Sequence, residues 1–132
     1  MLIFTQKSLL PKWAFNCTIH YMKNKGQIQT YLQQCLRNGR ILRWIDKCMP
    51  LTVYIAPFRF YSKQGEDYKY RQMVLRALET WQNISGGKVT FEITNALCNS
   101  QVNIDWKRVD RNALGYCNFS FDNYNRLFSA DV

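Results

Sequence analysis

The chain has 132 residues, of which 47% are hydrophobic and 15% aromatic, so one domain with an apolar core is expected. Its formal net charge is +9, and its five cysteines include no C-x-x-C pair. This cysteine spacing argues against a zinc knuckle, and no apolar run in the sequence approaches transmembrane length.

The basic excess is concentrated in the N-terminal part of the chain. Residues 1–50 hold eight Lys/Arg and one Asp, whereas residues 51–132 hold ten Lys/Arg and eight Asp/Glu. A basic segment can attract nucleic acid or an anionic membrane, although it is more often a solvated surface. The odd number of cysteines and the lack of a convincing signal peptide favour reduced thiols and a cytoplasmic location, with a disulfide such as Cys98–Cys117 left open.

The first forty residues are predicted to be an N-terminal extension. Residues 1–26 show no clean period and indicate an irregular segment. Apolar residues return at helical spacing over residues 27–37, and Asn38-Gly39 is a suitable stop, so this stretch predicts a packing helix. We therefore divide the chain into residues 1–40, with one helix, and a second region over residues 41–132.

The second region alternates strand patterns with one long helix. Residues 51–56 predict a strand, and residues 68–81 predict the helix, which Ser85-Gly86-Gly87 would end. The expected buried stripe of that helix is Tyr70, Met73, Val74, Ala77, Leu78 and Trp81, with Lys69, Gln72, Arg76, Glu79 and Gln82 solvated. Further strands are predicted over residues 88–94, 101–106, 113–117 and 126–132, with a turn over residues 119–125.

These elements predict an α+β fold. We expect a mixed, mainly parallel twisted sheet of about five strands, with the long helix packed on it and the N-terminal helix added. A glycine in the strand over residues 113–117, Gly115, is expected to mark a bulge.

The sequence assembles no catalytic set. Its one histidine, His20, lies in the irregular extension, and the H-E-x-x-H, glycine-rich phosphate-loop and G-x-S-x-G motifs do not occur. Asp122 and Asp131, with Asn123 and Asn125, offer oxygen ligands of the kind that calcium prefers, although such a stretch is more often only a turn. The residues alone therefore predict no catalytic residue and no metal ligand.

Several segments of the second region, taken in order, resemble those of a known family. They are Trp44 with residues 49–55, the helix positions Val74, Ala77, Leu78 and Trp81, and residues 88–91, 102–106, 113–117 and 127–132. In this order and spacing they resemble the N-terminal part of the catalytic domain of matrixin-like zinc metalloproteases, which belong to the metzincin class. The resemblance covers residues 41–132.

The resemblance implies a hydrolase that cleaves peptide bonds. In this family the three histidines of H-E-x-x-H-x-x-G-x-x-H hold the catalytic zinc, and the glutamate is the general base toward the zinc-bound water. The motif follows the last strand of the resemblance and does not occur in these residues. We therefore expect a fragment truncated before the zinc-binding helix, inactive and without zinc by itself, whereas the full-length protein would use zinc on a peptide or protein substrate.

The resemblance also implies a substrate-binding edge strand, formed by Ala113, Leu114, Gly115 and Tyr116. The free backbone groups of an edge strand can pair with an extended peptide, and an ordinary sheet edge explains the same residues equally well. Where animal matrixins carry histidines for a structural zinc, this chain has Tyr116 and Asp131. A structural zinc is therefore not implied.

Two other hypotheses remain open. The alternative to a peptidase fragment is a small basic non-enzymatic binding module for nucleic acid or an anionic surface, based on residues 7–47 with Trp13, Tyr21, Tyr31 and Trp44. A remnant without function would be poorly soluble. For the peptidase fragment we expect no nucleic-acid partner and no transmembrane segment, but self-association through an exposed sheet.

Overall fold

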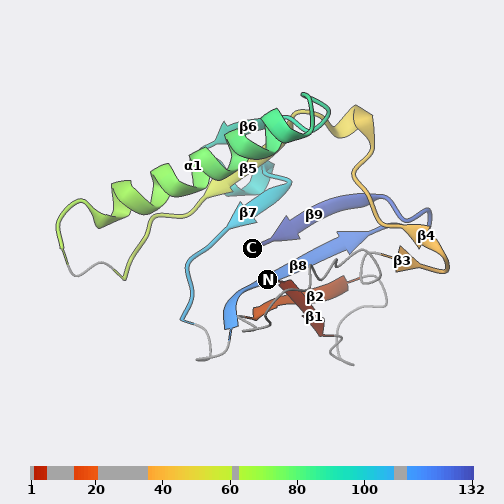
Figure 1. Cartoon of the computed structure of the whole chain (residues 1–132), viewed down its shortest axis with the longest axis horizontal. Helices are drawn as coiled ribbons and strands as arrows, with labels where there is room; N and C mark the ends of the chain where they lie inside the picture. Colours follow the sequence, from red (N-terminus) through yellow and green to blue (C-terminus); the bar gives the residue numbers. More distant parts are fainter. Residues whose placement is uncertain (1, 6–13, 21–35, 61–62, 109–112) are drawn as a thin grey trace. The chain divides into compact units, whose positions relative to one another are not determined.

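The computed structural model describes residues 2–5, 14–20, 36–60, 63–108 and 113–132. The chain divides into two compact units: a first unit of Met1–Ile45 with Lys107–Val132, and a second unit of Asp46–Trp106. The predicted α+β class is confirmed, because strands pair both in parallel and antiparallel and the described residues include one long helix (Figure 1).

The second unit is organised around strand β5 (Leu51–Ile55). This strand lies between β6 (Phe91–Thr94) and β7 (Val102–Ile104) and runs parallel to both. The amide of Leu51 donates to the carbonyl of Thr90 at 2.8 Å, and the amide of Ala56 donates to that of Ile104 at 2.8 Å. The strand therefore has hydrogen-bonded neighbours on both edges, which explains its nearly continuous apolar sequence.

Helix α1 (Glu66–Ile84) confirms the long helix predicted from apolar spacing (Figure 1). It ends at the predicted stop, where Gly86 and Gly87 have φ values of 63° and 77°. The amide of Gly87 donates to the carbonyl of Gln82 at 2.9 Å, so the left-handed glycines allow the last carbonyls of the helix to be satisfied.

The face that α1 covers is rotated from the predicted stripe. Val74 and Leu78 are half-buried, but Met73 and Trp81 are 55% and 62% exposed, which corrects their assignment to the buried side. Gln82, predicted to be solvated, is half-buried, and its Oε1 accepts a 2.7 Å hydrogen bond from the amide of Phe91. The apolar residues of α1 therefore extend beyond the face of the helix that the rest of the unit covers.

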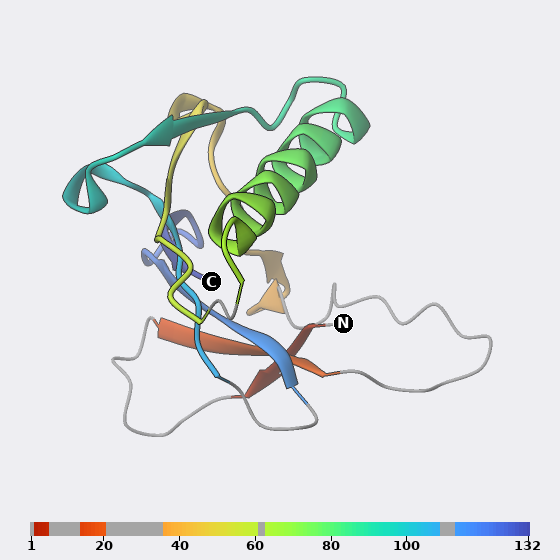
Figure 2. The same ribbon diagram turned by 90° about the vertical axis from the view of Figure 1, so that its left-hand side faces the viewer.

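The described strands of the first unit pair antiparallel. Strand β8 (Ala113–Phe121) pairs with β2 (Ala14–His20) on one side and with β9 (Leu127–Asp131) on the other, and β1 (Leu2–Thr5) pairs with β2 (Figure 2). The prediction of mainly parallel pairing therefore holds only for the second unit.

Strand β8 is longer than the predicted strand. Phe119 and Phe121 fall in the predicted turn, yet both are buried and pack with Leu42 in the core of this unit. Asn118 and Ser120 alternate with them on the other face of the strand, and the turn was predicted because residues 119–125 are rich in Asn and Asp. A bulge does occur beside Gly115, because the register passes from Gly115 to Ala113 and leaves Leu114 without a partner in β2.

The N-terminal extension is more regular than predicted. Strands β1 and β2 lie within residues 1–26, which were expected to be irregular. Residues 27–35 of the predicted helix lie outside the described residues, and its last two residues form β3 (Leu36–Arg37), paired with β4 (Arg40–Ile41). Asn38 and Gly39 have φ values of 50° and 72°, so they form a two-residue hairpin turn rather than a helix stop.

Two short 3-10 helices complete the second unit. They are η2 (Asp46–Cys48), which precedes β5, and η3 (Leu97–Asn99), which precedes β7.

The core of the first unit gives a stability prediction. Phe121 is 1% exposed, whereas Phe128 in β9 is 50% exposed. We expect Phe121→Ala to lower the free energy of unfolding by about 3–5 kcal/mol, because it removes a buried ring and leaves a cavity. Phe128→Ala is the matched control and should cost about 1 kcal/mol or less. Urea denaturation measures both, and equal losses would contradict this core.

Candidate functional site

The predicted substrate strand lies in β8, where it is already paired. Ala113, Gly115 and Tyr116 are opposite His20, Ile19 and Thr18 of β2, and Leu114 lies at the bulge. On its other side β8 pairs with β9 from Asn118 onward. Strand β2 therefore occupies one side of this segment, and substrate binding by these four residues stays a prediction.

The described residues offer no metal centre. Among them, no three His, Cys, Asp or Glu residues come together where they could hold a metal ion. Asp122, a candidate calcium ligand, instead accepts a 2.6 Å hydrogen bond at Oδ2 from Nε of Arg126. The described residues thus provide no ligand set for a catalytic zinc, and no chemical step through zinc follows from them.

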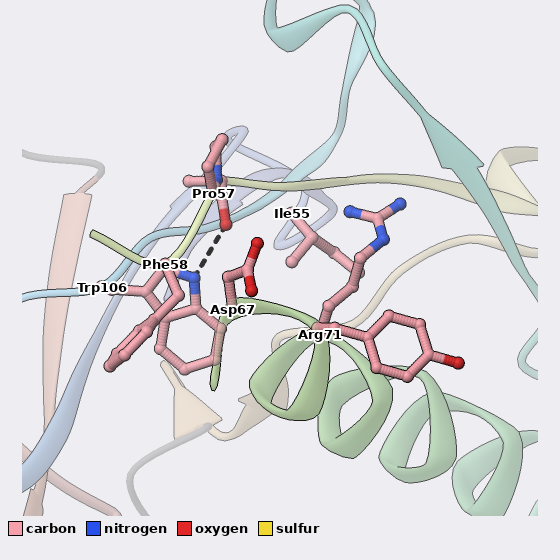
Figure 3. A pocket seen from close by; sticks show the side chains of 8 residues that line it. Ile55, Pro57, Phe58, Asp67, Arg71 and Trp106 are labelled. Atoms are coloured by element: carbon pink, nitrogen blue, oxygen red, sulfur yellow. Dashed lines mark hydrogen bonds between the residues drawn. The ribbon is translucent and has the colours of Figure 1, made fainter. Parts of the chain in front are cut away.

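A concave site lies in the second unit, at the carboxyl ends of β5 and β7. It is a cavity of about 250 Å³ next to the first turns of α1 (Figure 3). Its walls are formed by Ile55, Ala56, Pro57, Phe58, Asp67, Tyr68, Arg71 and Trp106. The carboxyl ends of parallel strands are the usual place for ligands in open α/β sheets, so this position is the expected one.

An aromatic cluster fixes the floor of this cavity. The ring of Phe58 lies 4.1 Å from that of Tyr70 and 5.3 Å from that of Trp106, centroid to centroid. Tyr70 and Trp106 are 5.6 Å apart. The indole Nε1 of Trp106 donates a 2.8 Å hydrogen bond to the carbonyl of Ala56, which holds the ring at the end of β5. The cluster thus joins the segments after β5 and β7 to α1.

Two opposite charges lie beside the aromatic floor. Asp67 and Arg71 are one turn apart on α1, and Figure 3 shows the Asp67 carboxylate between the aromatic rings and Arg71. The structure places no ion pair between these two described side chains. Asp67 lies in the first turn of α1, where the helix dipole favours a carboxylate. The cavity can hold an apolar or aromatic group the size of a side chain, next to either charge.

Sequence reasoning missed this cavity because its walls come from three separate segments. Phe58 was assigned to a loop, and Asp67 and Arg71 lie outside the predicted apolar stripe. The available signal was that Pro57-Phe58 follows one predicted strand and Trp106 ends another, and parallel strands end at the same edge of a sheet.

A second polar surface lies in the first unit, and we call it the arginine cluster: Arg37, Arg40, Arg43 and Arg126. Arg37 is directly opposite Arg40 in the β3–β4 hairpin, and Arg43 forms a parallel bridge with Arg126. Like charges facing each other across strands are destabilising, so this arrangement is unusual for a purely structural surface.

Buried Asn125 connects the two arginine pairs. Its Nδ2 donates to the carbonyl of Arg37 at 3.1 Å, and its own carbonyl accepts from the amide of Arg43 at 3.2 Å. The guanidinium of Arg37 also lies 4.7 Å from the centre of the Phe121 ring. The backbones of the two pairs are therefore held together by hydrogen bonds.

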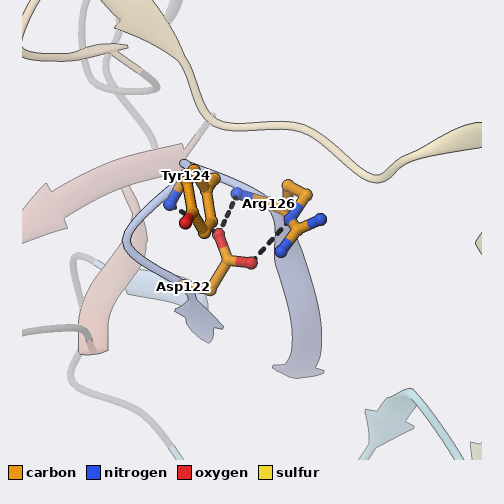
Figure 4. Close-up of polar contacts among 3 residues, drawn as sticks. All are labelled: Asp122, Tyr124 and Arg126. Atoms are coloured by element: carbon orange, nitrogen blue, oxygen red, sulfur yellow. Dashed lines mark hydrogen bonds and ion pairs between the residues drawn. The ribbon is translucent and has the colours of Figure 1, made fainter.

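The turn between β8 and β9 carries a carboxylate with a shifted pKa (Figure 4). Partial desolvation raises the pKa of the Asp122 carboxyl. Hydrogen bonds from Arg126 and from the Tyr124 amide, together with the positive charge of Arg126, outweigh this effect and lower the pKa. Tyr124 is 75% exposed, and the Arg126 guanidinium lies 4.9 Å from the centre of its ring. Arg126 is thus partly neutralised, unlike the other three arginines.

Comparison with protein families, with curated protein sequences and with solved structures finds no match to this chain. In the part of the chain that the structure describes, no helix combines the length and the apolar character needed to cross a membrane.

The aromatic floor gives a testable prediction. Trp106→Phe removes the donor to Ala56 and leaves that carbonyl unsatisfied, so we expect the free energy of unfolding to fall by about 1–2 kcal/mol. Trp81→Phe is the matched control, because Trp81 is largely exposed on α1, and its effect should be near zero. Chemical denaturation compares them, and an equal or larger loss for Trp81→Phe would show that Trp106 is not anchored.

The lowered pKa of Asp122 predicts a pH dependence. The pKa of Asp122 is lower in the folded protein than in the unfolded chain, where it is near 3.8. The carboxylate therefore stabilises the fold at pH values above the unfolded pKa. This contribution is lost as the pH falls through the folded pKa. The stability difference between wild type and Asp122→Asn should therefore be largest at neutral pH and shrink in acid. Thermal melts across this pH range measure it, with Asp46→Asn as the exposed control. A difference that is constant with pH would contradict the shift.

Proposed function

We propose that this chain forms the strand-and-helix part of the catalytic domain of a matrixin-like zinc metallopeptidase of the metzincin class. The observation that carries the proposal is the element order, because β5, α1, β6, β7, β8 and β9 follow one another as the resemblance implies. The parallel pairing of β6 and β7 with β5 and the antiparallel pairing of β8 with β9 are compatible with this order.

Under this proposal the substrate is an extended peptide that pairs with residues Ala113, Leu114, Gly115 and Tyr116. Support comes from β2, which shows that the backbone of this segment accepts an antiparallel partner strand. A peptide that pairs on the same side must displace β2. Main-chain hydrogen bonds would then supply affinity, and contacts to alternate side chains of the peptide would supply selectivity.

The residues that hold zinc are not among these 132 under this proposal. The H-E-x-x-H-x-x-G-x-x-H motif does not occur in the sequence, and the described residues assemble no metal ligands. The chain by itself is therefore expected to leave peptide bonds intact. Cleavage of a casein substrate by the purified chain, abolished by a zinc chelator, would contradict this expectation.

The direct test of the family proposal is the coding sequence that follows the codon for Val132. The proposal predicts H-E-x-x-H-x-x-G-x-x-H in one of the reading frames, separated from Val132 by a short connection. If a stop codon follows and no frame encodes the motif downstream, the metallopeptidase proposal fails.

A second candidate function is favoured by the arginine cluster. The first unit holds eleven of the eighteen Lys/Arg but only three of the nine Asp/Glu, so most of the basic excess belongs to it. We propose single-stranded nucleic acid as the ligand, because guanidinium groups bind phosphates and exposed Tyr124 offers a ring on which a base can stack.

Salt dependence and charge removal test this second candidate. Phosphate contacts from Arg37, Arg40 and Arg43 predict that the logarithm of the binding constant falls with the logarithm of salt concentration with a slope of about −2, and Arg40→Ala with Arg43→Ala should remove about two thirds of this slope. Fluorescence anisotropy with a labelled oligonucleotide measures it. Arg76→Ala with Lys88→Ala, in the second unit, is the control and should change nothing. Equal losses in both double variants, or binding only to anionic vesicles, would overturn this candidate.

A further inference from the structure

Two cysteines face each other in the first unit. The β2–β8 register places Cys17 opposite Cys117, between the pairs Asn16–Asn118 and Thr18–Tyr116. The first irregularity in this pairing lies beyond Ile19. The two cysteines therefore belong to a regular part of the antiparallel ladder.

The geometry of such a pair suits a disulfide bond. Residues directly opposite in an antiparallel pair have Cα atoms about 4.5 or about 5.5 Å apart, and their side chains lie on the same face of the sheet. Disulfides span Cα separations of about 4.4–6.8 Å, a range that includes both of these spacings. Cys117 is half-buried in the structure.

We infer that Cys17 and Cys117 form a redox-sensitive disulfide that ties β2 to β8. The two thiols lose two protons and two electrons when the Sγ–Sγ bond forms. A small-molecule disulfide such as oxidised glutathione accepts them: one Cys thiolate attacks it and releases one thiol, and the second Cys thiolate then resolves the mixed disulfide and releases the other. Excess dithiol reverses the reaction.

This inference differs from the pairing that the sequence left open. Of the two candidate partners for Cys117, the register supports Cys17, and Cys98 is an exposed thiol in the second unit. The inference rests on the register alone and does not depend on the proposed function. If the peptidase proposal also holds, the disulfide would keep β2 on the side of β8 that a peptide needs.

Peptide mapping of the full chain tests the disulfide directly. The purified protein is incubated with oxidised glutathione, thiols are blocked, and the protein is digested with trypsin without reduction. Cleavage after Lys and Arg gives one peptide of residues 13–23 with Cys17 and one of residues 112–126 with Cys117. We expect to detect these two peptides linked to each other. After reduction, the mass of the linked pair should be replaced by the masses of the two separate peptides. Unlinked peptides, or either peptide linked mainly to another cysteine, would overturn the inference.

Thiol counts and matched variants give an independent readout. Reactive thiols in denaturant should fall from five to three on oxidation, since two are consumed. Cys48→Ser with Cys98→Ser should keep the linked peptide, whereas Cys17→Ser should abolish it. Oxidation should raise the melting temperature of the wild type by about 5–15 °C, because the bond closes a long loop, and leave that of Cys17→Ser unchanged. A linked peptide that persists in Cys17→Ser would contradict the assignment.

Discussion

The second unit depends on one constraint, the burial of a parallel strand that has neighbours on both edges. Leu51, Val53 and Ile55 are all buried, and Val53 has an exposed fraction of 0%. Strands that run parallel cannot be joined by a tight turn, so the chain between β5 and β6 must cross back over the sheet, and α1 makes that crossing. The buried strand thus determines both the direction of β6 and the presence of the helix.

The same constraint positions the cavity. Because β5 and β7 are parallel, the residues that follow them reach the same edge of the sheet, and Phe58 and Trp106 meet there against Tyr70 of α1. The hydrogen bond from Trp106 to the carbonyl of Ala56 satisfies a backbone group where the strand ends. Asp67 and Arg71 reach this edge only because the helix begins beside it.

The first unit supports a charged surface, the arginine cluster. The short β3–β4 hairpin places two arginines opposite each other, and Asn125 bonds the backbones of that hairpin and the β8–β9 turn. Beneath them, Leu42, Phe119 and Phe121 form the apolar core. The neighbouring β2 pairs with β8 along most of its length, so any role of β8 in peptide binding is coupled to the N-terminal strands.

Sequence patterns predicted the elements that local periodicity specifies. The long helix and its glycine stop were recognised because apolar spacing and left-handed glycines are local signals, and β5 because its apolar run is bounded by prolines. The extension of β8 was missed because the Asn and Asp residues of the stretch 119–125 indicated a turn, whereas strand pairing continues through Phe121.

Other features depend on tertiary contacts that periodicity cannot show. The exposed side of α1, including Met73 and Trp81, could not be distinguished from its covered side, since both are apolar. The strands β1 and β2, the opposed cysteines and the aromatic floor all require pairing between distant segments. The strand predicted over residues 113–117 lies within β8, but its pairing with β2 has no signature in its own sequence.

Native-state hydrogen exchange measured by NMR tests the central place of β5 most directly. If this buried strand organises the second unit, the amides of Val53 and Ile55 exchange only through global unfolding of the unit. Helix α1 has no buried residue, so the amides near its ends should exchange faster. Exchange of the β5 amides that is as fast as that of the helix ends would contradict this account.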